Sequence, residues 1–291
     1  MNRFTPVKLL PLILSTLLLT SCSGPDSSGG VEFSKTANAF PYGDCRGSGY
    51  QTHSTYATGC GWVNVNEKSS YIRPNGDLSH LDLTRVDLTN AKLNGANLSY
   101  TTLSYANLTN ARLFSANLSY AYLSRATLTN ANLFDANLTN AYLRRSHMNE
   151  ANLRFADLTK ANLIDVDLRN ADLMHANLSR ANLSYANLAR ANLQVANLSN
   201  ASLFKTFFYY AKLSYANLNG ANLSNASLPR TLLYSADLTN ANLSNASLLN
   251  GTNLSNANLS GANLTGVRVN SSTICPNGKP WGVGNGGNCP F

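Results

Sequence analysis

Leucine recurs at every fifth position from Leu78 to Leu248, and only Met148 and Phe208 stand in its place. Alanine precedes most of these leucines by two positions, Asn or Asp usually lies between them, and two mostly polar residues follow, as in the segment ANLSY at 96–100. A repeat this short, sustained through most of the chain, must be identified as an architecture before any single residue is interpreted as a site.

A period of five fits neither a straight helix nor a flat strand. In a helix, a step of five turns about 500°, so the leucines would spiral around it instead of lining one face. In a flat strand, alternate leucines would point to opposite surfaces. The pattern is satisfied by a chain that turns a corner after every pentad, so that about twenty residues close one square coil with leucine and alanine inside. Asn or Asp, between them, then points outward.

These pentads resemble the A-[DN]-L-x-x pattern of the pentapeptide repeat family. The resemblance implies an all-β fold, a right-handed quadrilateral β-helix, over residues 76–269. About ten coils at the roughly 4.8 Å spacing of paired strands give a rod of about 45–50 Å.

The first 21 residues predict a secretory signal peptide, because Arg3 and Lys8 precede an apolar run that is too short to span a membrane. Their end, LTS before Cys22, resembles the lipobox of bacterial lipoproteins. This implies cleavage before Cys22, attachment of acyl chains such as palmitate to that cysteine, and lipid anchoring in the bacterial cell envelope. Ser23 resembles the signal for the outer membrane where one is present. An ordinary signal peptide with an incidental Cys22 is the alternative.

Residues 22–30 are polar and glycine-rich, which predicts a flexible tether. Residues 31–75 lack the repeat, and we interpret them as a cap on the open N-terminal end of the solenoid. A separate ligand-binding module there is the alternative. Residues 270–291 resemble the cysteine-paired tails of some pentapeptide repeat proteins and are expected to cap the other end.

We predict one disulfide in each cap, Cys45–Cys60 and Cys275–Cys289. The other two connectivities of these four cysteines would have to bridge a rod about 45 Å long, whereas a disulfide requires Cα atoms within about 7 Å.

The formal charge is +8, and removal of the signal peptide lowers it to +6. A basic chain suits nucleic acid in principle. An exported, lipid-tethered chain meets envelope polymers first, so we expect no nucleic-acid partner. Some members of the family inhibit or protect topoisomerases by DNA mimicry, which is the alternative function, but that activity needs an acidic, cytoplasmic rod.

Candidate catalytic groups are sparse. His147 and Glu150 share a pentad without a third partner, and Phe155 separates Asp135 from His175 in their stack. Without a pocket, such pairs are ordinary surface groups. The cysteine spacing matches no metal site, and we expect no enzyme activity, no cofactor and no metal.

Because outward residues twenty apart are stacked neighbours, surface clusters follow from the sequence. The candidate binding face combines tyrosine and arginine, which interfaces concentrate, and consists of Tyr105, Tyr122, Arg125, Tyr142, Arg144 and Arg145. Stacking Arg125 on Arg145 favours an anionic partner, either an acidic protein or an envelope polysaccharide. An ordinary solvated face is the alternative, because Asp165 follows Arg145 by one coil.

Two further surfaces have competing interpretations. The Asn column that begins at Asn97 is a regular polar array that matches ice or a glycan, or is simply a family preference. The aromatic segment FKTFFYY at 204–210 serves local stabilisation or docking. The sequence as a whole predicts a non-enzymatic, lipid-anchored envelope protein whose rigid solenoid presents a binding surface or acts as a spacer.

Overall fold

The computed structural model describes residues 61–65, 68–282 and 289. The predicted signal peptide, Cys22, the tether, Cys45 and Cys60, and most of the expected N-terminal cap lie outside the described residues.

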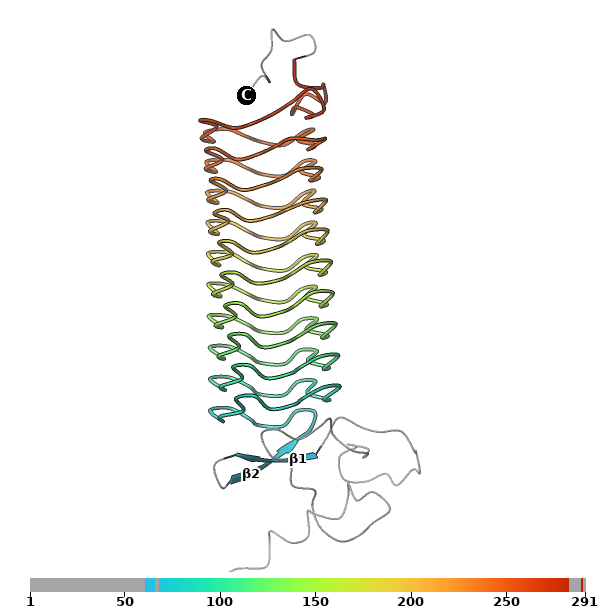
Figure 1. Ribbon diagram of the computed structural model, residues 1–291, viewed down its shortest axis with the longest axis vertical. Helices are drawn as coiled ribbons and strands as arrows, with labels where there is room; N and C mark the ends of the chain where they lie inside the picture. Colours follow the sequence, from blue (N-terminus) through green and yellow to red (C-terminus); the bar gives the residue numbers. More distant parts are fainter. Residues whose placement is uncertain (1–60, 66–67, 283–288, 290–291) are drawn as a thin grey trace, which may run out of the picture.

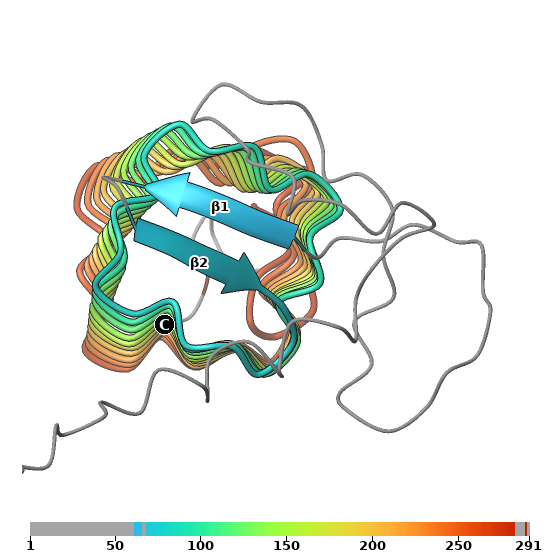
Figure 2. The ribbon, with the colours of Figure 1, turned by 90° about the horizontal axis from the view of Figure 1, so that it is seen from below.

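From residue 75 onward the chain winds into a stack of square coils (Figure 1), and the view along the axis shows the four-sided outline (Figure 2). Isolated parallel bridges join residues twenty apart, from Asp77 with Asn97 onward. Leucine and alanine fill the interior, and most of them are fully buried. The predicted all-β, right-handed quadrilateral β-helix is confirmed, and the described residues contain no helix.

Each pentad forms one side of the square. We name the sides by one coil: side A is 96–100, side B 101–105, side C 106–110 and side D 111–115, and each continues at intervals of twenty. The sides follow one another in the order A, B, C and D around each coil, so side B lies opposite side D across the core and side A lies opposite side C. The fifth residue of each pentad lies at the corner that leads to the next side.

Every backbone amide of a typical pentad has a hydrogen-bond acceptor. In 96–100, four amides donate to backbone carbonyls at 2.7–3.0 Å, three of them on neighbouring coils. The fifth amide, of Ser99, donates to Oδ1 of Asn97 at 3.2 Å. A buried backbone amide without a hydrogen-bond partner is costly. The side chain of Asn or Asp in the second position supplies the acceptor for this last amide. The polar column that begins at Asn97 is therefore occupied with the fold's own hydrogen bonds, which include Asn117 Nδ2 to Asn97 Oδ1 at 3.2 Å.

The fifth residue of the pentad adopts the left-handed conformation, with φ near 60°. Asn and Gly tolerate this region best, and a β-branched residue is a genuine outlier in it. Among the described residues with positive φ, Val195 at 60° is the β-branched one.

Threonine replaces the inward alanine at five buried positions. Each hydroxyl donates to a main-chain carbonyl of the previous coil at 2.5–2.8 Å, so the buried oxygen has a partner. The five residues are Thr101, Thr206, Thr231, Thr252 and Thr273.

Two short strands, β1 (Gly61–Val65) and β2 (Lys68–Ile72), form an antiparallel hairpin. The hairpin lies across the N-terminal end of the solenoid (Figure 2), and Ile72 is fully buried against the core. This end of the hydrophobic stack is thereby covered.

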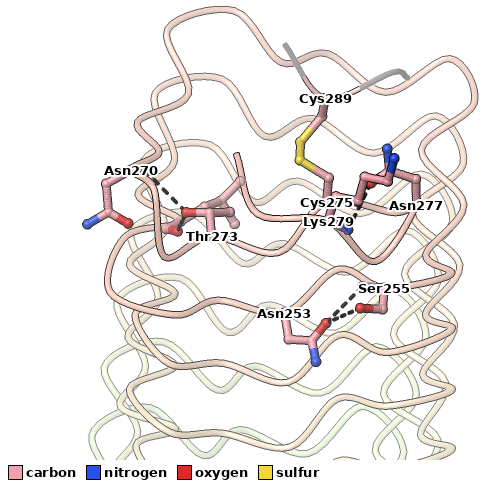
Figure 3. Close-up of a disulfide and its surroundings, with 9 residues drawn as sticks. Asn253, Ser255, Asn270, Thr273, Cys275, Asn277, Lys279 and Cys289 are labelled. Atoms are coloured by element: carbon pink, nitrogen blue, oxygen red, sulfur yellow. Dashed lines mark hydrogen bonds between the residues drawn. A yellow bond between two sulfur atoms is a disulfide. The ribbon is translucent and has the colours of Figure 1, made fainter. Parts of the chain in front are cut away.

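The C-terminal end begins with a register change. The turn at 249–251 contains one additional residue, with Gly251 at φ 89°, so the bridge spacing becomes 21, as between Leu232 and Asn253. Beyond the last coil a disulfide joins Cys275 and Cys289 with their Cα atoms 5.5 Å apart (Figure 3). This bond ties the end of the chain to the final turns.

Candidate functional site

The six residues of the candidate binding face come together on side B. Tyr122 and Tyr142 stack on successive coils, with ring centroids 4.9 Å apart and planes within 5°. Both rings are more than two-fifths exposed, and Arg144 beside them is exposed as well. Side B therefore presents a flat pair of aromatic rings next to a cation.

The corner after side B carries a column of arginines around Tyr105. The guanidiniums of Arg85 and Arg125, one coil on either side, lie 5.5 and 5.4 Å from the Tyr105 ring centroid. Arg125 Nη1 also donates to Tyr105 Oη at 2.9 Å. Such cation–π contacts are worth about 0.5–1 kcal/mol each at exposed sites.

Arg145 turns the other way along the rod, and its Nε lies 3.4 Å from Asp165 Oδ2. Arg125 and Arg145 thus take partners on opposite sides. The like-charge repulsion expected between them is relieved within the chain, so it does not by itself require an added anion. The case for binding on side B rests on its rings and its exposed cations.

A second aromatic column, which was not predicted from the sequence, borders side B. His80, Tyr100 and Tyr120 stack at the corner between sides A and B, at 5.0 and 4.8 Å with planes within 3°. Tyr120 is separated from Tyr122 by a single buried alanine. The signal was present in the twenty-residue spacing of these three residues.

Tyr122 and Tyr142 occupy the second pentad position, where Asn or Asp usually accepts the amide of the fourth residue. A phenol ring pointing outward lacks that acceptor, so the turn loses a hydrogen bond worth about 0.5–1.5 kcal/mol. Two such replacements on adjacent coils therefore exchange turn hydrogen bonds for a pair of stacked, exposed rings.

Asp167 and Arg169 form a close ion pair on the solenoid. Arg169 donates to both carboxylate oxygens of Asp167, at 2.8 and 2.6 Å. Burial raises the pKa of Asp167, but the hydrogen bonds and charge of Arg169, aided by His147, outweigh it and hold the pKa below its usual value. Asp167 is therefore an ionised partner of Arg169 and is not poised to transfer a proton.

Asp135 and His175 are separated as expected. Phe155 stacks on His175 at 4.9 Å, and Asp135 accepts a hydrogen bond from Ser115 Oγ at 2.8 Å. In the described ranges no three His, Cys, Asp or Glu residues are placed to hold a metal.

A cavity of about 80 Å³ opens at the C-terminal end, where the leucine stack stops. Its described lining is mostly apolar, includes Leu254, Leu264 and Trp281, and contains no Asp, Glu, His, Lys or Arg. The hydroxyl of Thr273, which also lines it, donates to the carbonyl of Leu248. Within the part of the chain that the structure describes, no helix is long and apolar enough to cross a membrane.

The family model for pentapeptide repeats matches eight copies, which cover residues 82–208 and 211–273. A comparison with curated proteins finds no match.

Among solved structures, the chain is similar to HetL of Nostoc sp. strain PCC 7120, a pentapeptide repeat protein involved in heterocyst differentiation regulation. The identity is 31%, the match covers 72% of this chain and 91% of HetL, and the TM-score is 0.30. A pentapeptide repeat protein of the Arabidopsis thaliana thylakoid lumen is 31% identical over 35% of this chain and 63% of its own length, with a TM-score of 0.26. QnrB1, a plasmid-mediated fluoroquinolone resistance protein, is 17% identical over 68% of this chain and 90% of its own, with a TM-score of 0.29.

Proposed function

This chain belongs to the pentapeptide repeat family, and on that premise we propose that it is a non-enzymatic, lipid-anchored protein of the bacterial cell envelope. Its rigid solenoid presents side B to an acidic protein or an envelope polysaccharide. Proteins of this family are generally scaffolds and not catalysts. The lipobox-like ending before Cys22 supports the anchor.

The stacked pair Tyr122 and Tyr142 carries the binding proposal. Their rings are fixed by the coil spacing, so little side-chain freedom is lost when a partner packs against them. A sugar ring or an apolar side chain stacks on the tyrosines, while Arg144 and its neighbours bind carboxylate or phosphate groups through two parallel hydrogen bonds. The same surface therefore suits a partner that combines flat rings or apolar groups with negative charge.

DNA mimicry gains no support from the charge of the rod. Between residues 173 and 291 there are seven Lys and Arg residues against the single acid Asp237. A surface that imitates the phosphate backbone must be acidic along its length.

The test compares Arg125→Ala/Arg145→Ala with the unchanged chain in binding to detergent-solubilised envelope proteins and purified envelope polysaccharide. Loss of two charge-assisted contacts weakens binding about tenfold or more and removes most of its salt dependence. The melting temperature holds, because the contacts of both arginines are exposed and worth little.

Lys92→Ala/Arg112→Ala is the matched control, since these cations also stack on successive coils but lie on side D, opposite side B. This control keeps full binding. Unchanged binding by the side B variant at low salt would remove side B as the docking surface.

A further inference from the structure

The two halves of the solenoid differ in charge. Residues 76–172 carry nine acidic and nine basic residues, whereas no acid occurs between Asp172 and Asp237. That acid-free stretch contains Arg180, Arg190, Lys205, Lys212 and Arg230. The yellow and orange coils of Figure 1 thus form a cationic belt around the rod.

Exposed apolar side chains gather on sides C and D of this belt. We call them the C/D patch, and they are Val195, Phe207, Tyr209, Tyr210, Tyr215, Leu232 and Tyr234. Phe207 is 53% exposed and Leu232 is 40% exposed. Arg190, Arg230 and Lys212 are exposed on the same two sides.

Three of these residues break the local rules of the pentad. Phe207 and Leu232 replace the outward Asn or Asp, so each removes the side-chain oxygen that elsewhere accepts a turn amide. Val195 is a β-branched residue in the left-handed conformation, at φ 60°, which costs backbone energy. Such violations cluster where function outweighs local stability.

Contacts within the C/D patch arrange its rings. Arg230 lies over the Tyr210 ring at 5.1 Å, and Tyr209 meets Tyr210 edge-on at 4.4 Å. Tyr215 and Tyr234 make a second edge contact at 5.5 Å. The patch is thus a set of preorganised rings among cations, with aliphatic side chains between them.

We propose that the C/D patch lies on the surface of an anionic phospholipid bilayer. Aromatic and aliphatic groups beside Lys and Arg are the composition of surfaces that lie at a membrane interface. A soluble polyanion would use the cations and the rings but would leave Leu232 and Val195 facing water. The acyl boundary of a bilayer accepts these side chains, and the absence of carboxylates from the patch avoids repulsion by anionic headgroups.

This contact has a geometric consequence that rests on the proposed envelope function. A lipid on Cys22 would attach the N-terminal end, and the C/D patch would hold the distant half of the rod against the same membrane. Several acyl chains on Cys22 would suffice for stable attachment, so the C/D patch would add orientation of the rod on the membrane. Because side B lies opposite side D, the rod would then present Tyr122 and Tyr142 away from the membrane.

The test uses the chain without its signal peptide and with Cys22→Ser, so that no acyl chain contributes. The protein is sedimented with vesicles of phosphatidylcholine alone or mixed with phosphatidylglycerol. We expect binding to the mixed vesicles that falls with salt, and little binding to the neutral ones. Removal of one cation from the patch weakens binding to the mixed vesicles about fivefold. The variant Arg190→Asn/Arg230→Asn measures this effect for two cations.

The apolar contribution is measured with Val195→Asn/Phe207→Asn/Leu232→Asn. Each change installs the residue that the pentad prefers at its position, so the variant folds at least as stably, and it should bind vesicles at least tenfold more weakly. Tyr122→Asn/Tyr142→Asn makes the same kind of change on side B and keeps full vesicle binding.

Equal vesicle binding by the triple variant and the unchanged chain would overturn the proposal. So would binding to soluble polyglutamate without binding to vesicles, which would assign the C/D patch to an acidic macromolecule. Failure of acylation in cells would refute the anchor alone, because these vesicle assays use unacylated protein.

Discussion

At the scale of single residues, the second position of the pentad holds either a side chain that the fold uses for hydrogen bonds or one that it does not. Asn97 accepts the amide of Ser99 and the side chain of Asn117, so its outward face is already used by the fold. Tyr122 and Leu232 stand in the same position without that capacity, and each lies in a cluster of exposed rings. Exposed apolar side chains in this position, and not every departure from the repeat, therefore mark the surfaces proposed for binding.

The third position of the pentad is the most sensitive to charge. Leu98 and Leu178 are fully buried among other leucines, so Leu98→Asp or Leu178→Asp places a carboxylate where it has no partner. We expect a loss of about 3–5 kcal/mol in unfolding free energy, or no folding, by thermal and urea unfolding. Ser99→Asp, which points toward solvent, changes stability by less than about 1 kcal/mol. Wild-type melting temperatures for both leucine variants would contradict the inward assignment.

Spacing predicted which residues meet, but it did not predict how their side chains turn. A separation of twenty placed Tyr122 on Tyr142 correctly, because the coil fixes both Cα positions. The same rule placed Arg125 beside Arg145, yet Arg125 bonds to Tyr105 and Arg145 to Asp165. Long side chains choose among several neighbours by electrostatics and rotamer preference, which a count of positions does not contain.

At the scale of elements, stacking of the coils builds the core and the hydrogen-bond network, and the caps protect the two ends of the solenoid from fraying. Pentads bury leucine and alanine from all four sides, and neighbouring coils supply the missing hydrogen bonds, so only the two ends lack a neighbour. The hairpin β1–β2 covers one end (Figure 2), and the Cys275–Cys289 disulfide secures the other (Figure 3). The five-residue period is absent from the hairpin region, which is why β1 and β2 were not predicted as strands.

The C-terminal disulfide should act locally. It closes a loop with a sequence separation of 14, and a loop of that size is worth about 3 kcal/mol in the chain-entropy model. In Cys275→Ser/Cys289→Ser we expect faster amide hydrogen exchange in the last two coils and unchanged exchange near Asp77, because each coil contacts only its neighbours.

Peptide mapping without reductant is the accompanying check on both caps. It should recover Cys275 joined to Cys289 and, in the N-terminal segment, Cys45 joined to Cys60. A peptide that joins Cys45 to Cys275 would refute the layout with one cap at each end. Faster exchange spread evenly along the rod would contradict the local role of the C-terminal bond.

At the scale of the whole molecule, the rod separates two chemically different surfaces. Side B, in the neutral half, carries stacked tyrosines with arginines, and the C/D patch, in the cationic half, mixes rings, aliphatic groups and cations. The square section places sides B and D back to back (Figure 2). A rigid solenoid can therefore face a membrane and a partner at once, without a moving part.

The lipid-anchored location is tested most directly by labelling cells with radioactive palmitate, separating cytosol from envelope and isolating the chain from each fraction. We expect a labelled mature protein in the envelope that detergent releases, and we expect the Cys22→Ser variant to lose the label and to remain unprocessed. Unlabelled mature protein in the cytosol would refute lipid anchoring and would return DNA mimicry to consideration.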